Sequence, residues 1–186
     1  MITLNIKQEE MKSSLNFATE IIFGGNQFDR FNQSVATQIT RNYVVKLAGY
    51  IFLHFLQSCY IIAKEGDMFE IFQGAENADT FDFLFPNGQS IDIKTASLPF
   101  HQRIMVPISQ FHLCKYYYVG IKLNFITTTY NIEPNNINTA IIQRYINSST
   151  LKNQPSQNFV EGDCKAFPLR NLLDIEQLIL MYNDAR

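Results

Sequence analysis

The sequence predicts a single α/β domain in which helices flank a central mixed β-sheet. Three observations favour this class: an apolar pattern with helical spacing over residues 32–63, a β-hairpin formed by residues 80–85 and 90–95, and strand-like segments at 116–128 and 140–146. The chain has 186 residues, of which 46% are apolar, and this is enough for one hydrophobic core. We therefore expect one domain spanning residues 1–186.

Composition restricts the function classes. Charged residues make up 17% of the chain and the formal net charge is −2, so a polyanion would need a local basic patch. The spacing of Cys59, Cys114 and Cys164 predicts neither a disulfide framework nor a zinc ribbon. The sequence also lacks the pattern of a signal peptide or a membrane span. We expect a cytoplasmic protein with no membrane partner.

The helical elements are predicted from their periodicity. The first 25 residues end in Gly24-Gly25 and are expected to form short irregular structure. Apolar side chains then recur every four residues, which predicts one long core helix: Val35, Ile39, Tyr43, Leu47, Ile51 and Phe55. A closing helix is predicted over residues 168–183, with Pro168 near its first turn.

Shorter elements fill the remainder of the chain. Residues 68–72 are expected to form a strand before the hairpin, and residues 107–113 a short helix after it. The polar runs 131–138 and 147–158 are expected to be loops. The strands at 116–128 and 140–146 are rich in aromatic and β-branched residues, as is typical of a buried sheet.

The hairpin turn fixes which side chains share a face. Phe85-Pro86-Asn87-Gly88-Gln89 has the pattern of a three-residue loop with Gly88 in the left-handed region, which places Phe85 opposite Gln89. Counting back from this pair puts Asp82 opposite Asp92 and Phe83 opposite Ile91. One face of the hairpin is therefore predicted to be apolar and the other acidic.

The acidic face has the residues of a metal site. Two opposed carboxylates repel each other unless a cation, a proton or a base neutralises them, and Lys94 lies on their face. A site with a small number of carboxylates, whose oxygen atoms are hard ligands, is suitable for Mg²⁺ or Mn²⁺. These ions complete their coordination with water and phosphate oxygens. The pattern predicts metal-dependent hydrolysis of a phosphodiester, with Lys94 orienting water or offsetting developing charge.

The spacing Asp82-x9-Asp92-Ile93-Lys94-Thr95 resembles the core of the PD-(D/E)XK, or restriction endonuclease-like, superfamily. A long helix, the hairpin, and then a helix and a strand are similar to that family's core over about residues 32–128. The resemblance implies a restriction endonuclease-like core, Asp82 and Asp92 as metal ligands, and Lys94 as a catalytic residue. It also implies a Mg²⁺-dependent endodeoxyribonuclease that acts on DNA, with a homodimer reaching both strands.

Other residues are candidates for accessory roles. Many members of the family add a glutamate from the helix, but residues 33–64 contain no acidic residue, and Glu70 or Glu20 would have to replace it. Asp79 is a candidate to support the metal ligands, and His101 and Arg103 follow the hairpin closely enough to contact a phosphate. The missing helix glutamate favours an alternative, a catalytically silent module that binds nucleic acid or protein.

Three consecutive tyrosines, Tyr116, Tyr117 and Tyr118, precede a predicted strand. Their rings would stack on nucleic-acid bases if they were exposed beside the site. Aromatic residues entering a strand also pack commonly in a core, so both interpretations stand at this point.

Overall fold

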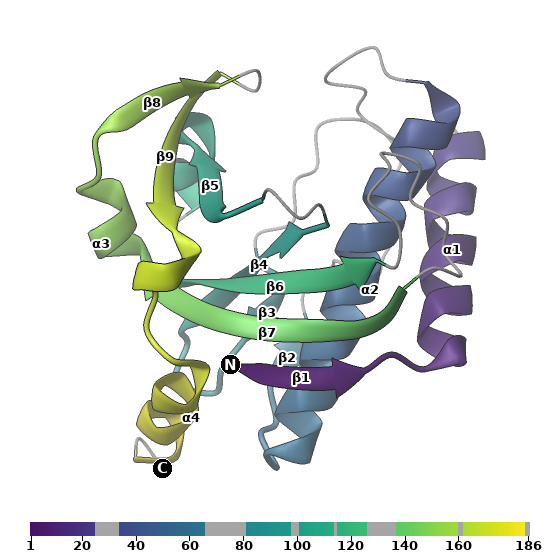
Figure 1. The fold of residues 1–186 in the computed structure, drawn as a ribbon. Helices are drawn as coiled ribbons and strands as arrows, with labels where there is room; N and C mark the ends of the chain where they lie inside the picture. Colours follow the sequence, from purple (N-terminus) through teal and green to yellow (C-terminus); the bar gives the residue numbers. More distant parts are fainter. Residues whose placement is uncertain are drawn as a thin grey trace.

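The computed structural model describes residues 1–24, 34–65, 81–97, 101–113, 115–125, 137–159 and 162–184. Its larger sheet is mixed and curled, with the strand order β1-β7-β6-β4-β3-β2 (Figure 1). The strands are β1 (Ile2–Asn5), β2 (Lys64–Glu65), β3 (Phe83–Leu84), β4 (Ser90–Ala96), β6 (Tyr117–Phe125) and β7 (Ile137–Asn147). β4 and β6 run parallel and the other neighbours are antiparallel. The predicted α/β class with a central mixed sheet is confirmed.

Helices cover one face of this sheet. They are α1 (Gln8–Phe23), α2 (Val35–Ser58) and α4 (Ile175–Asp184), and α2 corresponds to the predicted core helix (Figure 1). The Ser34 side chain caps α2 by accepting the Thr37 N–H at 3.3 Å. Side chains of α2 and α4 bury against the apolar face of the hairpin, where Phe83 and Ile91 are fully buried. This burial fixes which face β4 turns toward the helices.

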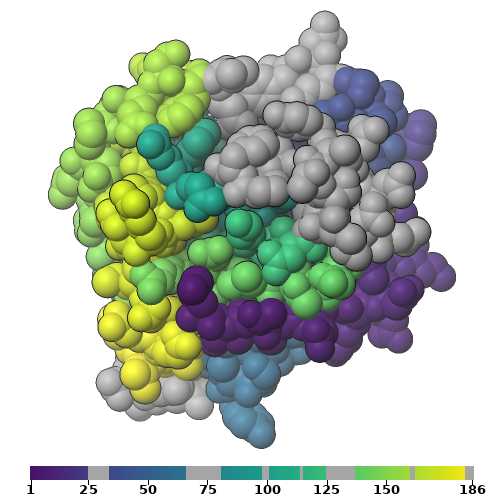
Figure 2. All heavy atoms as spheres, viewed as in Figure 1, coloured from purple at the N-terminus to yellow at the C-terminus, as the bar shows by residue number. Residues whose placement is uncertain are grey.

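A second, three-stranded sheet covers the other face. Its order is β5-β9-β8, with β5 (Arg103–Pro107), β8 (Ser156–Phe159) and β9 (Gly162–Pro168). A smaller core joins the two sheets: Ile104, Val106, Tyr118, Ile146, Leu151, Leu169 and Leu172. In the space-filling view, this sheet and the C-terminal segment form one side of the molecule, and β1 with α1 lies toward the other (Figure 2).

Close approach of the two layers depends on Gly120 in β6. A Cβ at this position would lie 3.2 Å from the Leu169 side chain and 3.5 Å from that of Ile104, closer than or at the limit of normal packing. Gly120 pairs with Lys94 across the parallel strands. The missing side chain therefore lets Leu169 and Ile104 pack closely against β6, the strand next to the one that carries the candidate site.

The N-terminal prediction is wrong. Residues 1–25 contain the edge strand β1 and the four-turn helix α1 rather than irregular structure. The fully buried residues of α1 are Glu10, Ser14 and Ala18, and Met11 and Leu15 also pack against the core. Apolar residues therefore do recur at helical spacing in this segment, at Met11, Leu15, Ala18 and Ile22. The start of the helix is stabilised by Glu10, whose Oε2 accepts the Lys7 N–H at 2.6 Å.

The predictions for the C-terminal third are also partly wrong. Residues 147–158 contain α3 (Ser148–Lys152) and β8, because Asn147 caps the short helix and the polar strand β8 pairs with β9 at a sheet edge. Pro168 ends β9 rather than opening a helix, and α4 begins at Ile175 after a 3₁₀ turn. The short helix at 107–113 is a 3₁₀ helix over Ile108–Leu113. The strand predicted at 68–72 lies outside the described residues.

Within the described ranges, no helix combines the length and the apolar composition that crossing a bilayer requires.

Candidate active site

The hairpin that carries the candidate site has the predicted turn and register. Gly88 has φ +82° and its N–H donates to the Phe85 carbonyl at 2.9 Å, which closes the three-residue loop. Phe83 pairs with Ile91 and Leu84 with Ser90. The ladder ends at the Phe83–Ile91 pair, so Asp82 lies one residue before β3 and outside the paired strand, while Asp92 lies within β4.

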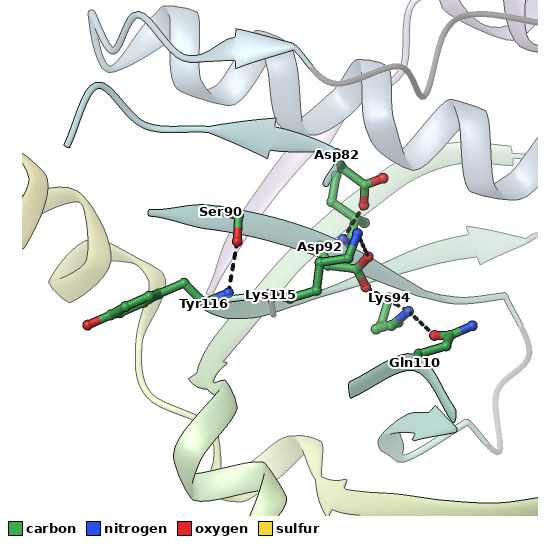
Figure 3. Close-up of polar contacts among 8 residues, drawn as sticks. Asp82, Ser90, Asp92, Lys94, Gln110, Lys115 and Tyr116 are labelled. Atoms are coloured by element: carbon green, nitrogen blue, oxygen red, sulfur yellow. Dashed lines mark hydrogen bonds and ion pairs between the residues drawn. The ribbon is translucent and has the colours of Figure 1, made fainter. Parts of the chain in front are cut away.

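Asp82 lies directly before β3 and is held to β4 by its backbone and its side chain. Its N–H donates to the Ile91 carbonyl at 3.0 Å, and its Oδ2 accepts the Ile93 N–H (Figure 3). The other carboxylate oxygen points away from Asp92 (Figure 3). The hairpin thus fixes the Asp82 carboxylate through backbone contacts rather than through flexible side chains.

Two lysines bind the Asp92 carboxylate. Lys94 Nζ lies 2.6 Å from Oδ2, and Lys115 Nζ lies 3.2 Å from Oδ1 (Figure 3). Lys94 also donates to Gln110 Oε1 at 3.4 Å and is 25% exposed, whereas the Lys115 side chain is only 4% exposed. The Lys94 ammonium group therefore lies on the solvent side of Asp92, and the Lys115 ammonium group lies on its buried side.

The two carboxylates differ in their ionisation. Burial, and next the charge of Asp92, raise the pKa of Asp82 to about 7, although the Ile93 N–H and the two lysines oppose this shift. Burial also disfavours the charged form of Asp92, but Lys94 and Lys115 outweigh it and hold its pKa below the ordinary value. Near neutral pH, Asp92 is ionised and Asp82 exchanges its proton readily.

Lys115 was not identified from the sequence. It stands between an apolar 3₁₀ helix and the buried strand β6, in a segment where aromatic side chains dominate. A lone lysine that enters a buried strand needs an anionic partner, and this requirement was the available signal. The partner itself is set by the parallel pairing of β4 with β6, which local sequence patterns do not specify.

A hollow of 630 Å³ opens from the carboxyl end of β4 and is lined by Lys94, His101 and Arg103; we call it the basic hollow. His101 Nδ1 accepts the Ser97 N–H at 3.3 Å. Burial, and next the charge of Lys122, lower the pKa of His101. Arg103 is exposed and donates to Gln157 Oε1 at 3.0 Å. The structure thus brings both predicted phosphate-contacting residues to the hollow that Lys94 lines.

The remaining candidate acids do not join the pair. Glu70 and Asp79 lie outside the described residues, and Glu20 is exposed on α1, a helix that packs with α2 on the face opposite Asp92. Across the described ranges, no group of three or more His, Cys, Asp or Glu residues is placed to hold a metal ion. The candidate site therefore rests on two carboxylates and two lysines.

This donor set fits Mg²⁺ or Mn²⁺ under one condition. Asp82 and Asp92 supply hard oxygen atoms close together, and loss of the Asp82 proton, whose pKa is raised to about 7, would provide a second charged ligand. Lys94, however, contacts Asp92 Oδ2 at 2.6 Å, on the side of the carboxylate where Lys94 leads to the basic hollow. Its ammonium would have to withdraw from that oxygen for a cation to bind there.

Comparison with known proteins yields no relatives: no family model, no curated protein and no solved structure matches this chain.

Proposed function

We propose that this chain is a metal-dependent phosphodiester hydrolase, and specifically a DNA endonuclease with a restriction endonuclease-like core. The observation that carries the proposal is the proximity of two buried carboxylates, Asp82 and Asp92, whose charges interact, with Lys94 Nζ 2.6 Å from Asp92. The order of α2, the β3–β4 hairpin and the parallel strand β6 agrees with the order that the resemblance implies, but the connection from β4 to β6 contains β5 and a 3₁₀ helix in place of the implied helix.

Each residue of the site has a role in this reaction. Asp82 and Asp92 would hold Mg²⁺, which when bound polarises a phosphate and acidifies a water molecule. Lys115 keeps Asp92 ionised from the buried side. Lys94, once it has left Asp92, orients water or offsets the charge that develops on the phosphate, and Gln110 holds its ammonium at the site.

The basic hollow supports a nucleic acid as the substrate. Lys94, His101 and Arg103 line it, and Lys122 places a further positive charge close to His101. A local basic surface of this kind is what a protein with a net charge of −2 needs to bind a polyanion. Cleavage of two strands of one substrate would require two copies of the site, which is why we propose a homodimer.

A specific observation favours a second candidate, a silent module that binds nucleic acid or protein. Both oxygens of Asp92 contact lysine ammonium groups, so the charges of the site are largely balanced without a metal ion. A buried network of this kind also stabilises a fold without any catalytic role.

A cleavage assay separates the two candidates. Purified protein is incubated with plasmid, single-stranded and branched DNA in Mg²⁺, Mn²⁺ or EDTA, beside the Asp92→Ala variant. The nuclease proposal expects cleavage that needs the divalent ion and Asp92. If the wild-type protein cleaves none of these substrates under any of these conditions, the silent module replaces it.

A further inference from the structure

A second hollow lies at the opposite end of β4 from the basic hollow. It has a volume of 520 Å³, and we call it the tyrosine hollow after the three rings that line it: Tyr116, Tyr117 and Tyr145. This volume is within the range of about 300–1,000 Å³ that is typical of small-ligand sites. It would hold a single nucleotide, but it is too small for a base pair with both backbones.

The tyrosine rings present aromatic surface to this hollow. Tyr117 packs edge-on against both other rings, with ring centroids 4.9 Å from Tyr116 and 5.6 Å from Tyr145. Tyr117 and Tyr145 are buried and therefore rigid, whereas Tyr116 is 50% exposed. A half-exposed ring supported by buried rings is suited to stack on a planar ligand without losing much side-chain freedom.

The charge of the hollow selects an anionic ligand. Lys152 lines it and supplies positive charge, whereas the ammonium group of Lys115, which also lines it, is paired with Asp92. None of the described lining residues is acidic. Asn147 and Ser149 add amide and hydroxyl groups that bond to each other at the rim, where Ser149 Oγ donates to Asn147 Oδ1 at 2.9 Å. An aromatic, cationic and hydrogen-bonding wall is complementary to a base that carries a phosphate.

Two consecutive residues, Lys115 and Tyr116, connect the tyrosine hollow to the carboxylate pair. Lys115 lines the hollow and also contacts Asp92 Oδ1 at 3.2 Å. The next residue, Tyr116, donates its N–H to Ser90 Oγ at 3.0 Å, which fastens it to β4 two residues before Asp92. Figure 3 shows the Tyr116 ring directed away from the carboxylates, so the hollow extends outward from the inner side of the site.

We propose that the tyrosine hollow binds one unpaired base of a DNA strand whose backbone passes the Asp82–Asp92 pair. The substrate is then single-stranded or branched DNA rather than an uninterrupted duplex. This inference rests on the proposed function only in taking the polymer to be DNA, because base binding in the hollow requires no metal ion.

Binding without metal tests the proposal directly. The probe is a short thymidine oligonucleotide with 2-aminopurine at its centre, titrated with protein in EDTA while its fluorescence and anisotropy are recorded. Stacking on tyrosine should quench the probe when wild-type protein binds. Tyr116→Ala should weaken binding about tenfold and abolish the quenching. The matched control is Phe23→Ala, which removes a 73% exposed ring from α1 and should change neither signal.

Two further measurements sharpen the result. Lys152→Ala should weaken binding and lower its salt dependence by about one released ion. The same oligonucleotide paired with its complement should bind more weakly than the single strand. Thermal unfolding of each variant establishes that it is folded.

The proposal is overturned if wild-type protein does not bind the single strand, if Tyr116→Ala binds and quenches it as wild type does, or if the duplex binds equally well. The proposed nuclease function fails by a different result, the absence of metal-dependent cleavage. If the protein quenches the probe through Tyr116 but cleaves no DNA, the proposed base-binding site stands and the proposed nuclease function fails.

Discussion

Lys115 lies with its Nζ 3.2 Å from Asp92 Oδ1, and its side chain is only 4% exposed. The contact links the start of β6 to the middle of β4 and places a positive charge on the inner side of the carboxylate pair. Without it, Asp92 and Asp82 would share one lysine in a largely buried setting. The site is therefore a group of two carboxylates and two ammonium groups whose charges balance. Removal of any one of these four side chains should change stability, metal binding or cleavage.

Lys115→Met should destabilise the fold, because a buried carboxylate loses its buried partner while the apolar stem is retained. We expect the free energy of unfolding to fall by about 3 kcal/mol. Urea titration measures it, with Lys64→Met on the exposed strand β2 as the control. Combining Lys115→Met with Asp92→Asn should recover much of the loss. A Lys115→Met protein as stable as wild type would contradict the buried ion pair.

Lys94→Ala should separate metal binding from cleavage. Lys94 is partly exposed and contacts the Asp92 oxygen that a cation would use, so its removal frees that oxygen. We expect the variant to fold, to bind Mn²⁺ at least as tightly as wild type, and to cleave DNA at least about a hundredfold more slowly. Lys64→Ala serves as the matched control. If Lys94→Ala cleaves DNA as fast as wild type, Lys94 has no role in catalysis.

The raised pKa of Asp82 predicts how stability depends on pH. The pKa is about 7 in the folded chain, against 3.8 for an unperturbed aspartate such as one in the unfolded chain, so folding binds a proton between these values. The contribution of Asp82 to stability is therefore greatest below about pH 4 and decreases as the pH rises through 7.

Asp82→Asn removes this titration and retains an oxygen that accepts the Ile93 N–H. Its stability relative to wild type should increase with pH, by up to about 1.4 kcal/mol per pH unit between pH 4 and 7. Urea titrations at several pH values measure this difference, and Asp163→Asn at an exposed position of β9 is the control. A difference that stays constant with pH would show that the Asp82 carboxyl ionises normally.

The hairpin could be predicted from sequence because its determinants are local. Gly88 and Asn87 specify the turn, and the turn specifies the register as far as the Phe83–Ile91 pair. Asp82, one residue further, leaves the ladder and binds the Ile93 N–H with its side chain, which the turn chemistry does not predict. The same reasoning identified Lys94, which is two residues beyond Asp92 on one strand. His101 and Arg103 follow closely in the chain, and they line the hollow that Lys94 opens into.

The features that were missed depend on contacts between distant parts of the chain. The second sheet pairs Arg103 with Pro168, and Lys115 reaches Asp92 only because β6 lies parallel to β4. α1 was missed for a different reason: its apolar side chains Met11, Leu15 and Ala18 share the buried face with polar residues, which weakens the period. One of these polar residues, Glu10, contacts His54 Nδ1 of α2, a contact between helices that local patterns do not reveal.

The central claim is that Asp82 and Asp92 together bind a divalent cation. Isothermal titration of Mn²⁺ into the metal-free protein at pH 8, where Asp82 has lost its proton, measures it most directly. We expect one Mn²⁺ site in the wild-type protein, no binding by Asp92→Ala, and unchanged binding by the control Asp163→Ala. If wild-type protein takes up no Mn²⁺, or if Asp92→Ala binds it with the wild-type affinity, the carboxylate pair is not a metal site.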